Sequence, residues 1–147
     1  MEIERKFLVK SIPANLEDYP HRAIEQGYLC TGPVVRIRRD GKEYVLTYKS
    51  KGLMVREEYN LPLTEEAYRH LSEKIDGHFV SKERYCIPYK DGLTIELDIF
   101  KGHLAPLVLA EVEFPTEEDA NTFLPPDWFA EDVTFSPLYH NSTLSKL

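Results

Sequence analysis

The sequence lacks the features that mark a secreted, membrane-spanning or zinc-binding protein. Its two cysteines, Cys30 and Cys86, lie far apart and match neither a zinc spacing nor a redox spacing. No apolar run approaches the roughly 18 residues that a membrane span needs, and the charged N-terminus is not that of a signal peptide. We therefore expect a cytoplasmic protein with free thiols and no membrane association.

Positive charge is also in short supply. The chain has 18 Lys and Arg residues against 25 Asp and Glu residues, which gives a formal net charge of −7. A chain this acidic is not expected to bind nucleic acid or an anionic membrane surface non-specifically. Its 147 residues are the size of one domain, so we expect a single domain over 1–147.

Strand-like segments recur along most of the chain, and we place them at 2–9, 24–30, 34–40, 43–50, 54–62, 79–89, 93–100 and 107–114. Asp40-Gly41-Lys42 and Lys90-Asp91-Gly92 read as hairpin turns between neighbouring strands. Helix signals occur only in 64–75 and 116–124, each of which begins with Thr followed by acids. This order predicts a mainly β (α+β) fold, a closed eight-stranded antiparallel barrel with a few short helices outside.

The predicted strands carry their charge on one face. Alternate side chains of a strand share a face, so Glu2, Glu4 and Lys6 form one row. Continued through the other strands, the same face holds seven acids (Glu2, Glu4, Glu58, Glu96, Asp98, Glu111, Glu113) and seven bases (Lys6, Arg36, Arg38, Lys49, Arg56, Lys82, Arg84). The opposite face is mostly apolar and can pack against helices or against a second copy in a homodimer.

Two interpretations of the charged face stay open at this point. An antiparallel sheet often has one face in water, and the rows would then be a solvated surface with weak ion pairs. Solvated faces usually mix in Ser, Thr, Asn and Gln, whereas charge fills nearly every position here. If the sheet curls with this face inward, its lumen is a charged tunnel. Buried charges are costly unless they are paired, so such a tunnel implies a highly charged ligand.

A ligand that needs both signs of charge narrows the chemistry. Lys and Arg suit phosphate oxygens, and clustered carboxylates suit a hard cation such as Mg²⁺. A complex of a divalent cation with a polyphosphate satisfies both sets together. Zinc is not expected, because no His or Cys cluster exists. A carboxylate pair acting on a sugar would leave the seven bases unexplained.

The N-terminal Glu2-x-Glu4-x-Lys6 resembles the ExExK motif of the CYTH, or triphosphate tunnel metalloenzyme, superfamily. The resemblance continues in the family's order through Gln26-Gly27-Tyr28-Leu29, Val35-Arg36-Ile37-Arg38, Leu46-Thr47-Tyr48-Lys49, Glu57-Glu58-Tyr59, Glu83-Arg84-Tyr85, Glu96-Leu97-Asp98-Ile99-Phe100 and Glu111-Val112-Glu113-Phe114. It covers almost the whole chain. The ordered set is most similar to the compact bacterial members associated with hydrolysis of inorganic tripolyphosphate.

This resemblance implies an eight-stranded tunnel that binds a small-molecule triphosphate with Mg²⁺ or Mn²⁺ and hydrolyses it. The implied metal ligands are Glu2, Glu4, Asp98, Glu111 and Glu113, with Glu58 and Glu96 as further lumen acids. The implied phosphate path comprises Lys6, Arg36, Arg38, Lys49, Lys82 and Arg84. The implied catalytic residues are Lys6, Tyr28, Glu4 and Glu111. Lys6 and Tyr28 are among them because tripolyphosphatase-like members pair a tyrosine at the position of Tyr28 with the ExExK lysine. His140, near the C-terminus, is expected at the surface.

Three other functions stay open on the sequence. The superfamily is partly named for adenylate cyclase, but we see no purine-reading device in the chain. A thiamine or nucleoside triphosphatase would be favoured by a tryptophan at the tunnel mouth, and the single tryptophan, Trp128, lies late in the chain. A non-catalytic polyphosphate- or nucleotide-binding module would need the bases but not all the carboxylates. The presence of Glu2, Glu4, Glu111 and Glu113 favours chemistry over binding alone.

Overall fold

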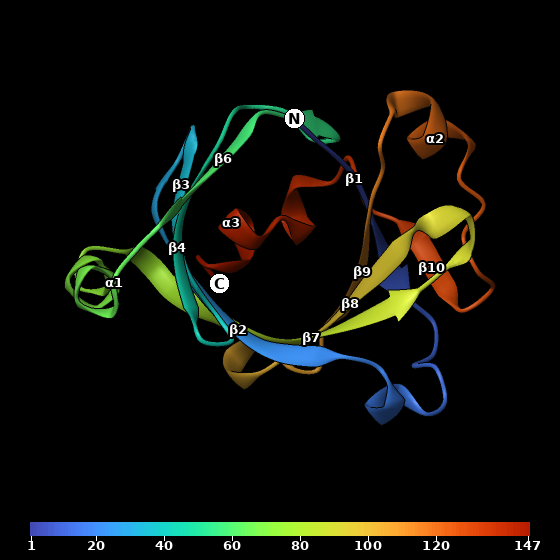
Figure 1. The fold of residues 1–147 in the computed structure, drawn as a ribbon, viewed down its shortest axis with the longest axis horizontal. Helices are drawn as coiled ribbons and strands as arrows, with labels where there is room; N and C mark the ends of the chain where they lie inside the picture. The colour runs from blue at the N-terminus through green and yellow to red at the C-terminus, as the bar shows by residue number, and fades with distance from the viewer.

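The computed structural model describes all residues from 1 to 147, and Figure 1 shows its strands arranged as a ring. The strands are β1 (Glu2–Val9), β2 (His21–Thr31), β3 (Val34–Asp40), β4 (Glu43–Lys49), β5 (Val55–Arg56), β6 (Glu58–Pro62), β7 (Asp76–Pro88), β8 (Thr94–Phe100), β9 (Val108–Glu113) and β10 (Phe129–Asp132). The helices are α1 (Glu65–Ser72), α2 (Glu117–Thr122) and α3 (Asn141–Leu144). All strand pairs are antiparallel, and the sheet order is β10-β1-β9-β8-β7-β2-β3-β4-β6.

The sheet closes through a broken strand. β6 pairs with β4 in a register that sets Glu58 opposite Lys49, and β5 pairs with the start of β1, with Arg56 opposite Glu2. Only Glu57 separates β5 from β6, so the chain passes from one edge of the sheet to the other at this residue. The prediction of a closed antiparallel barrel is confirmed. The segment 54–62, predicted as one strand, divides because it has to pair with a different strand on each side of the break.

Two strands are longer than predicted, and one was missed. β2 begins at His21 rather than at residue 24, and β7 begins at Asp76 rather than at residue 79. β10 is a four-residue strand that pairs with the second half of β1 on the edge where β5 pairs with the first half. The earlier start of β2 adds Arg22 to the row of Gln26 and Tyr28, because these residues share parity.

Most apolar side chains of the strands pack on the outside of the barrel. Phe7, Leu97 and Val112 belong to a buried cluster that also includes Ala120 of α2. α2 starts where the Thr116 hydroxyl accepts a hydrogen bond from the Asp119 amide at 3.1 Å, as expected for an N-cap. α1 contacts β3 and β4 on another part of the wall. The two predicted helices therefore lie outside the barrel and leave the charged face to the inside.

The C-terminal segment folds back against one end of the barrel, and Figure 1 shows α3 within the ring of strands. Leu144 of α3 packs with Val80, Phe100 and Leu109, and the His78 amide donates to the carbonyl oxygen of Ser145 at 2.7 Å. The sequence predicted helices only outside the barrel, so α3 was not predicted. No helix of the structure is both long enough and apolar enough to cross a membrane.

Candidate active site

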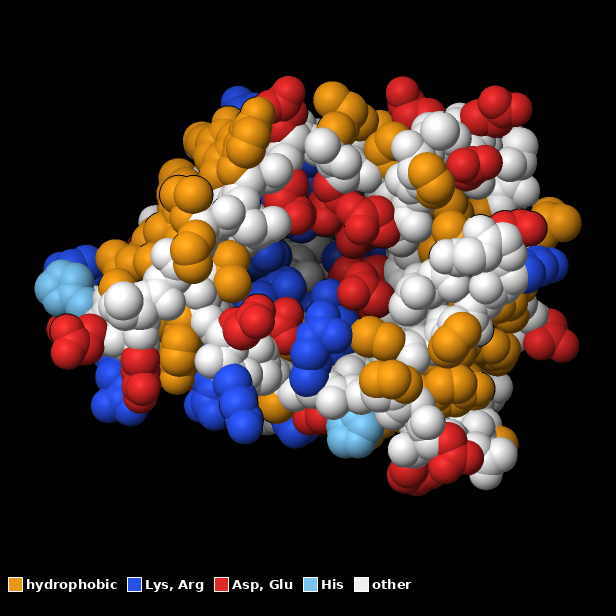
Figure 2. All heavy atoms as spheres, viewed as in Figure 1, with side chains coloured by type: hydrophobic (Ala, Val, Ile, Leu, Met, Phe, Trp, Pro, Cys, Tyr) orange, Lys and Arg blue, Asp and Glu red, His pale blue; other side chains and the backbone are white.

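The charged face of the strands encloses a cavity of about 370 Å³, and only three of its 22 lining residues are hydrophobic. Figure 2 shows the opening, with acidic side chains gathered along part of its edge and Lys and Arg side chains deeper inside. Of the fourteen charged residues that share parity in the sequence, all except Lys82 and Asp98 line this cavity. The inward-facing interpretation of the charged rows is therefore correct, and the solvated-face interpretation is not.

Lys82 and Asp98 lie in the wall of the tunnel, fully buried. The Asp98 carboxylate accepts two hydrogen bonds from Arg84, at 2.8 and 2.9 Å, and its Oδ2 lies 2.7 Å from Nζ of Lys82. Against the opposing effect of burial, Arg84 and Lys82 lower the pKa of the Asp98 carboxyl. Asp98 is thus committed to two cations in the wall, which differs from the metal-ligand role that the resemblance implies. Lys82 likewise faces Asp98 rather than the cavity.

Arg84 extends this wall contact to the acids at the cavity surface. Its Nη1 donates to Glu96 and its Nη2 donates to Glu111, both at 3.2 Å. One guanidinium therefore holds three carboxylates from two neighbouring strands, β8 and β9. Such charge-assisted, multidentate contacts fix the positions of their acceptors. Arg84 organises the acidic side of the cavity as well as lining it.

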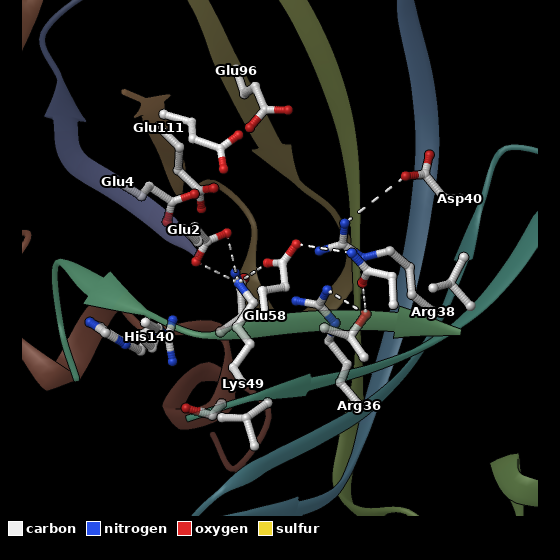
Figure 3. Close-up of a pocket in the computed structure, with 18 of the residues that line it drawn as sticks. Glu2, Glu4, Arg36, Arg38, Asp40, Lys49, Glu58, Glu96, Glu111 and His140 are labelled. Carbon is white, nitrogen blue, oxygen red and sulfur yellow. Dashed lines mark hydrogen bonds and ion pairs between the residues drawn. The ribbon is translucent and has the colours of Figure 1, made fainter. Parts of the chain in front are cut away.

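Glu4, Glu96 and Glu111 form a carboxylate cluster on that side, and Figure 3 shows their side chains converging. One oxygen from each of the three carboxylates lies within 4.8 Å of the other two. Burial, and then the neighbouring Glu111 and Glu2 carboxylates, raise the pKa of Glu4 well above its ordinary value. For Glu111, burial acts in the same direction, but Lys6, Arg84 and Lys82 together hold its pKa well below the ordinary range.

The carboxylate cluster fits a divalent cation. Glu111 Oε1 is buried without a hydrogen-bond partner, although Lys6 Nζ lies 3.4 Å away, outside hydrogen-bond geometry. Hard cations such as Mg²⁺ and Mn²⁺ take carboxylate oxygens as ligands. Carboxylate oxygens from β1, β8 and β9 therefore meet at one point, where an oxygen of Glu111 accepts no hydrogen bond. Glu96, which the resemblance placed only nearby, belongs to this cluster, whereas Glu113 lines the cavity at an exposed position.

Glu2 faces a lysine instead of joining the cluster. Lys49 Nζ lies 3.1 Å from the Glu2 carboxylate and 3.3 Å from that of Glu58 (Figure 3). Glu58 also accepts a hydrogen bond from Asn60 at 3.0 Å, and Asn60 in turn accepts one from the Thr47 hydroxyl at 2.6 Å. These contacts tie β1, β4 and β6 together across the point where the barrel closes.

Arg36 and Arg38 form a guanidinium pair on β3, on the side of the cavity away from the carboxylate cluster (Figure 3). Arg36 donates to Thr47 at 3.3 Å, but its Nε is buried without a hydrogen-bond partner. Burial, and then repulsion by Arg36 and Arg84, lower the pKa of Arg38 to about 9. Neither guanidinium donates a hydrogen bond to a carboxylate, and the nearest carboxylate to Arg38, that of Asp40, is 4.0 Å away, so the pair is suited to an anion with several oxygens.

Lys6 and Tyr28 both line the cavity, but they are not hydrogen-bonded to each other. Lys6 Nζ donates to the carbonyl oxygen of Tyr139 at 3.0 Å, and the Tyr28 hydroxyl accepts a long hydrogen bond of 3.4 Å from Gln26. Gln26 also accepts from Arg38 at 2.8 Å. The structure therefore connects Tyr28 to the guanidinium pair rather than to Lys6, which differs from the implied lysine–tyrosine pairing.

Several lining residues were missed by the sequence reasoning. Arg22 and Asp40 fall at the ends of β2 and β3, where a longer strand or an extended parity row would have included them. Thr47 and Asn60 share the charged parity but carry no charge. The expectation that His140 is a surface residue is wrong, because the C-terminal segment folds back and brings this histidine to the cavity. Burial, with Lys6 and Arg56 nearby, lowers the pKa of His140 to about 4.

Comparisons with known proteins agree with this site. The family model described as the CYTH domain matches residues 1–147. An inorganic triphosphatase of Nitrosomonas europaea is 43% identical over 98% of this chain and 96% of its own length. One of Acetivibrio thermocellus is 36% identical over 99% and 93%. A crystal structure of the inorganic triphosphatase NE1496 superposes with a TM-score of 0.73 at 40% identity, and the match covers 99% of this chain and 94% of that one.

We predict that Asp98→Asn lowers the free energy of unfolding by about 3–5 kcal/mol, because it leaves Lys82 and Arg84 buried without their carboxylate. Urea unfolding followed by circular dichroism measures the loss. Glu83→Gln is the matched control, since Glu83 pairs with His21 and Lys101 at the outer surface, and exposed pairs contribute about 1 kcal/mol or less. Equal small losses in both variants would contradict the wall assignment.

We predict that Glu4→Gln stabilises the metal-free protein at mildly alkaline pH. Because the pKa of Glu4 is raised in the folded state, the stability linked to its proton is complete below the ordinary value of 4.5. It is lost as the pH rises through the raised pKa, and glutamine removes that loss. Melting temperatures in EDTA across the pH range measure the effect. A melting temperature of the variant below that of the wild type in EDTA would refute the prediction.

Proposed function

The chain belongs to the CYTH domain family, and we propose that it hydrolyses triphosphates with the help of Mg²⁺ or Mn²⁺ and prefers inorganic tripolyphosphate. The observation that carries the proposal is that the cavity has an acidic side and a basic side, and that each side has a buried polar atom without a hydrogen-bond partner. A carboxylate oxygen on one side and a guanidinium nitrogen on the other are buried without partners. A cation–polyphosphate complex supplies the missing charge to both sides. Two relatives with near full-length coverage are named inorganic triphosphatases.

In this reaction Arg36 and Arg38 bind phosphoryl oxygens and orient the chain of phosphoryl groups within the cavity. The carboxylate cluster would hold the cation, which when bound neutralises phosphate charge and lowers the pKa of water. Water attacks a terminal phosphorus in line with the leaving oxygen, and a carboxylate oxygen of the tunnel accepts its proton. Lys and Arg side chains stabilise charge on the equatorial and leaving oxygens, so positioning and electrostatics supply most of the acceleration.

The lining of the cavity favours an inorganic substrate over a nucleotide or thiamine triphosphate. Those substrates need an apolar or aromatic surface for their organic group, whereas hydrophobic residues are rare around this cavity. Trp128 packs against Phe129 in the outer core, with ring centroids 4.7 Å apart, and does not line the cavity. The assignment of a homodimer and of a cytoplasmic location stays a prediction from the apolar outer face and the free thiols.

The test is phosphate release from tripolyphosphate, pyrophosphate, ATP and thiamine triphosphate with Mg²⁺, Mn²⁺ or EDTA. We expect hydrolysis of tripolyphosphate that EDTA abolishes, with ATP turned over slowly. Equal rates on ATP and tripolyphosphate would remove the preference but leave a triphosphatase. Tight binding of every triphosphate without release would identify a binding module instead.

We predict that Glu111→Gln abolishes turnover of tripolyphosphate and leaves the fold intact, because the cluster loses a ligand with an unused oxygen. Glu4→Gln should have the same effect. Turnover is measured at saturating Mg²⁺, together with the rise in melting temperature that Mg²⁺ gives the wild type and that both variants should lack. Glu57→Gln, at the exposed break between β5 and β6, is the matched control. Wild-type turnover in Glu111→Gln and Glu4→Gln would disprove the metal assignment.

A further inference from the structure

Arg22 and Asp40 form an ion pair that the reaction described above does not use. The Arg22 Nε donates to Asp40 Oδ1, and Nη1 lies 3.4 Å from the sulfur of Cys86. Both charged residues line the cavity, Arg22 from the start of β2 and Asp40 from the end of β3. An acid on the phosphate-binding side of the cavity needs an explanation, because it repels the anion that its neighbours attract.

The side-chain exposures place this pair at the open end of the cavity. The Arg22 side chain is 40% exposed, compared with 14% for Arg38 and 6% for Arg84. Arg22 lies opposite Arg84 in the register of β2 and β7. The positively charged lining of the cavity therefore extends from the buried Arg84 outward to the guanidinium of Arg22, which is exposed to solvent.

Asp40 holds the two outer guanidiniums in place. In addition to Arg22, its carboxylate lies 4.0 Å from Arg38 Nη1, and Arg38 is fixed on its other side by Gln26 at 2.8 Å. Figure 3 shows Asp40 and Arg38 on the side of the cavity away from the carboxylate cluster. Arg22 is thus the most exposed of these guanidiniums, and its strand β2 lies between β7, which carries Arg84, and β3, which carries the guanidinium pair.

We propose that Arg22 binds the outermost phosphoryl group of the substrate and selects for inorganic tripolyphosphate against nucleoside triphosphates, with Asp40 as its positioning residue. The inference rests on the proposed function. Arg22 can release its Nη1 from the thiol, because a cysteine sulfur is a weak acceptor. The guanidinium then offers two parallel N–H donors to phosphate oxygens.

The chemistry of the outermost group explains the selection. In tripolyphosphate this group is a free terminal phosphoryl with a second ionisable oxygen, whereas in ATP it is esterified to ribose and carries one negative charge. The uncharged ribose that follows gains nothing from Arg22 and meets the carboxylate of Asp40 instead. Arg22 can contact phosphoryl oxygens of either substrate, but the charge-assisted contact is stronger to the group with two ionisable oxygens, so its loss lowers kcat/KM more for tripolyphosphate than for ATP.

The test compares kcat/KM for tripolyphosphate and for ATP in the wild type, Arg22→Ala, Arg22→Gln and Arg22→Lys. We expect Arg22→Ala and Arg22→Gln to lower the value for tripolyphosphate roughly tenfold to a hundredfold and the value for ATP by a clearly smaller factor. Arg22→Lys should restore part of the loss, because it keeps the charge but not the paired donors. Asp40→Asn should shift the ratio in the same direction by a smaller factor.

Arg39→Ala is the matched control. Arg39 is an exposed arginine of β3 on the opposite face, where its Nε contacts the carbonyl oxygen of Gly41 at 3.4 Å, and its loss should leave both substrates unchanged. Equal losses on both substrates in Arg22→Ala and Arg22→Gln would show a structural role, and an unchanged ratio would remove Arg22 from the substrate. Either result overturns the inference while leaving the triphosphatase proposal standing. A wild type inactive on tripolyphosphate would overturn both.

Discussion

The buried carboxylate of Asp98, bonded to Arg84 on one side and to Lys82 on the other, supports the whole charged interior. A barrel lined with acids and bases has to remove many charges from bulk water, and each costs several kcal/mol unless a partner compensates it. Asp98 neutralises two buried cations at once. Arg84 also forms ion pairs with Glu96 and Glu111, so these two cavity acids are positioned by a cation of the wall rather than by each other.

The groups left without partners lie where a ligand would meet them. Within the wall, Asp98 has a cation on each of its oxygens, and Lys49 shares its charge between Glu2 and Glu58. At the cavity, an oxygen of Glu111 and a nitrogen of Arg36 have no hydrogen bond. Buried polar groups normally have hydrogen-bond partners. Two groups of opposite charge that lack partners, on facing walls of the cavity, therefore indicate where binding of a ligand would lower the free energy. The same residues destabilise the empty protein and favour the occupied one.

The parity of the strands made much of this site predictable. Within a single strand, alternation alone puts residues two positions apart on one face. This applies to Glu2, Glu4 and Lys6 on β1, to Arg36 and Arg38 on β3, and to Glu111 and Glu113 on β9. The residues that were missed follow a different logic. Arg22 lies before the predicted start of its strand, because that start depends on pairing with neighbouring strands rather than on local preference, and Asp40 was assigned to the turn that follows β3 although it continues the row of Arg36 and Arg38. His140 reaches the cavity through a segment that is short, irregular and held in place by contacts with distant strands.

The alternation of charged and apolar faces, the hairpin order of the strands and the identity of nearly all the ionisable groups in the cavity follow from the amino-acid sequence alone. These features are local, since they depend on neighbours one or two positions apart along a strand. The inward direction of the charged face is a property of the closed barrel, because closure depends on β5 reaching β1 from the far edge of the sheet. The folded barrel also places Asp98 and Lys82 in the wall and Glu96 beside Glu4 and Glu111, because parity assigns a face to each side chain but not a depth. The depth of each charge along the tunnel follows from the register between strands, and that register is fixed by packing across the whole barrel.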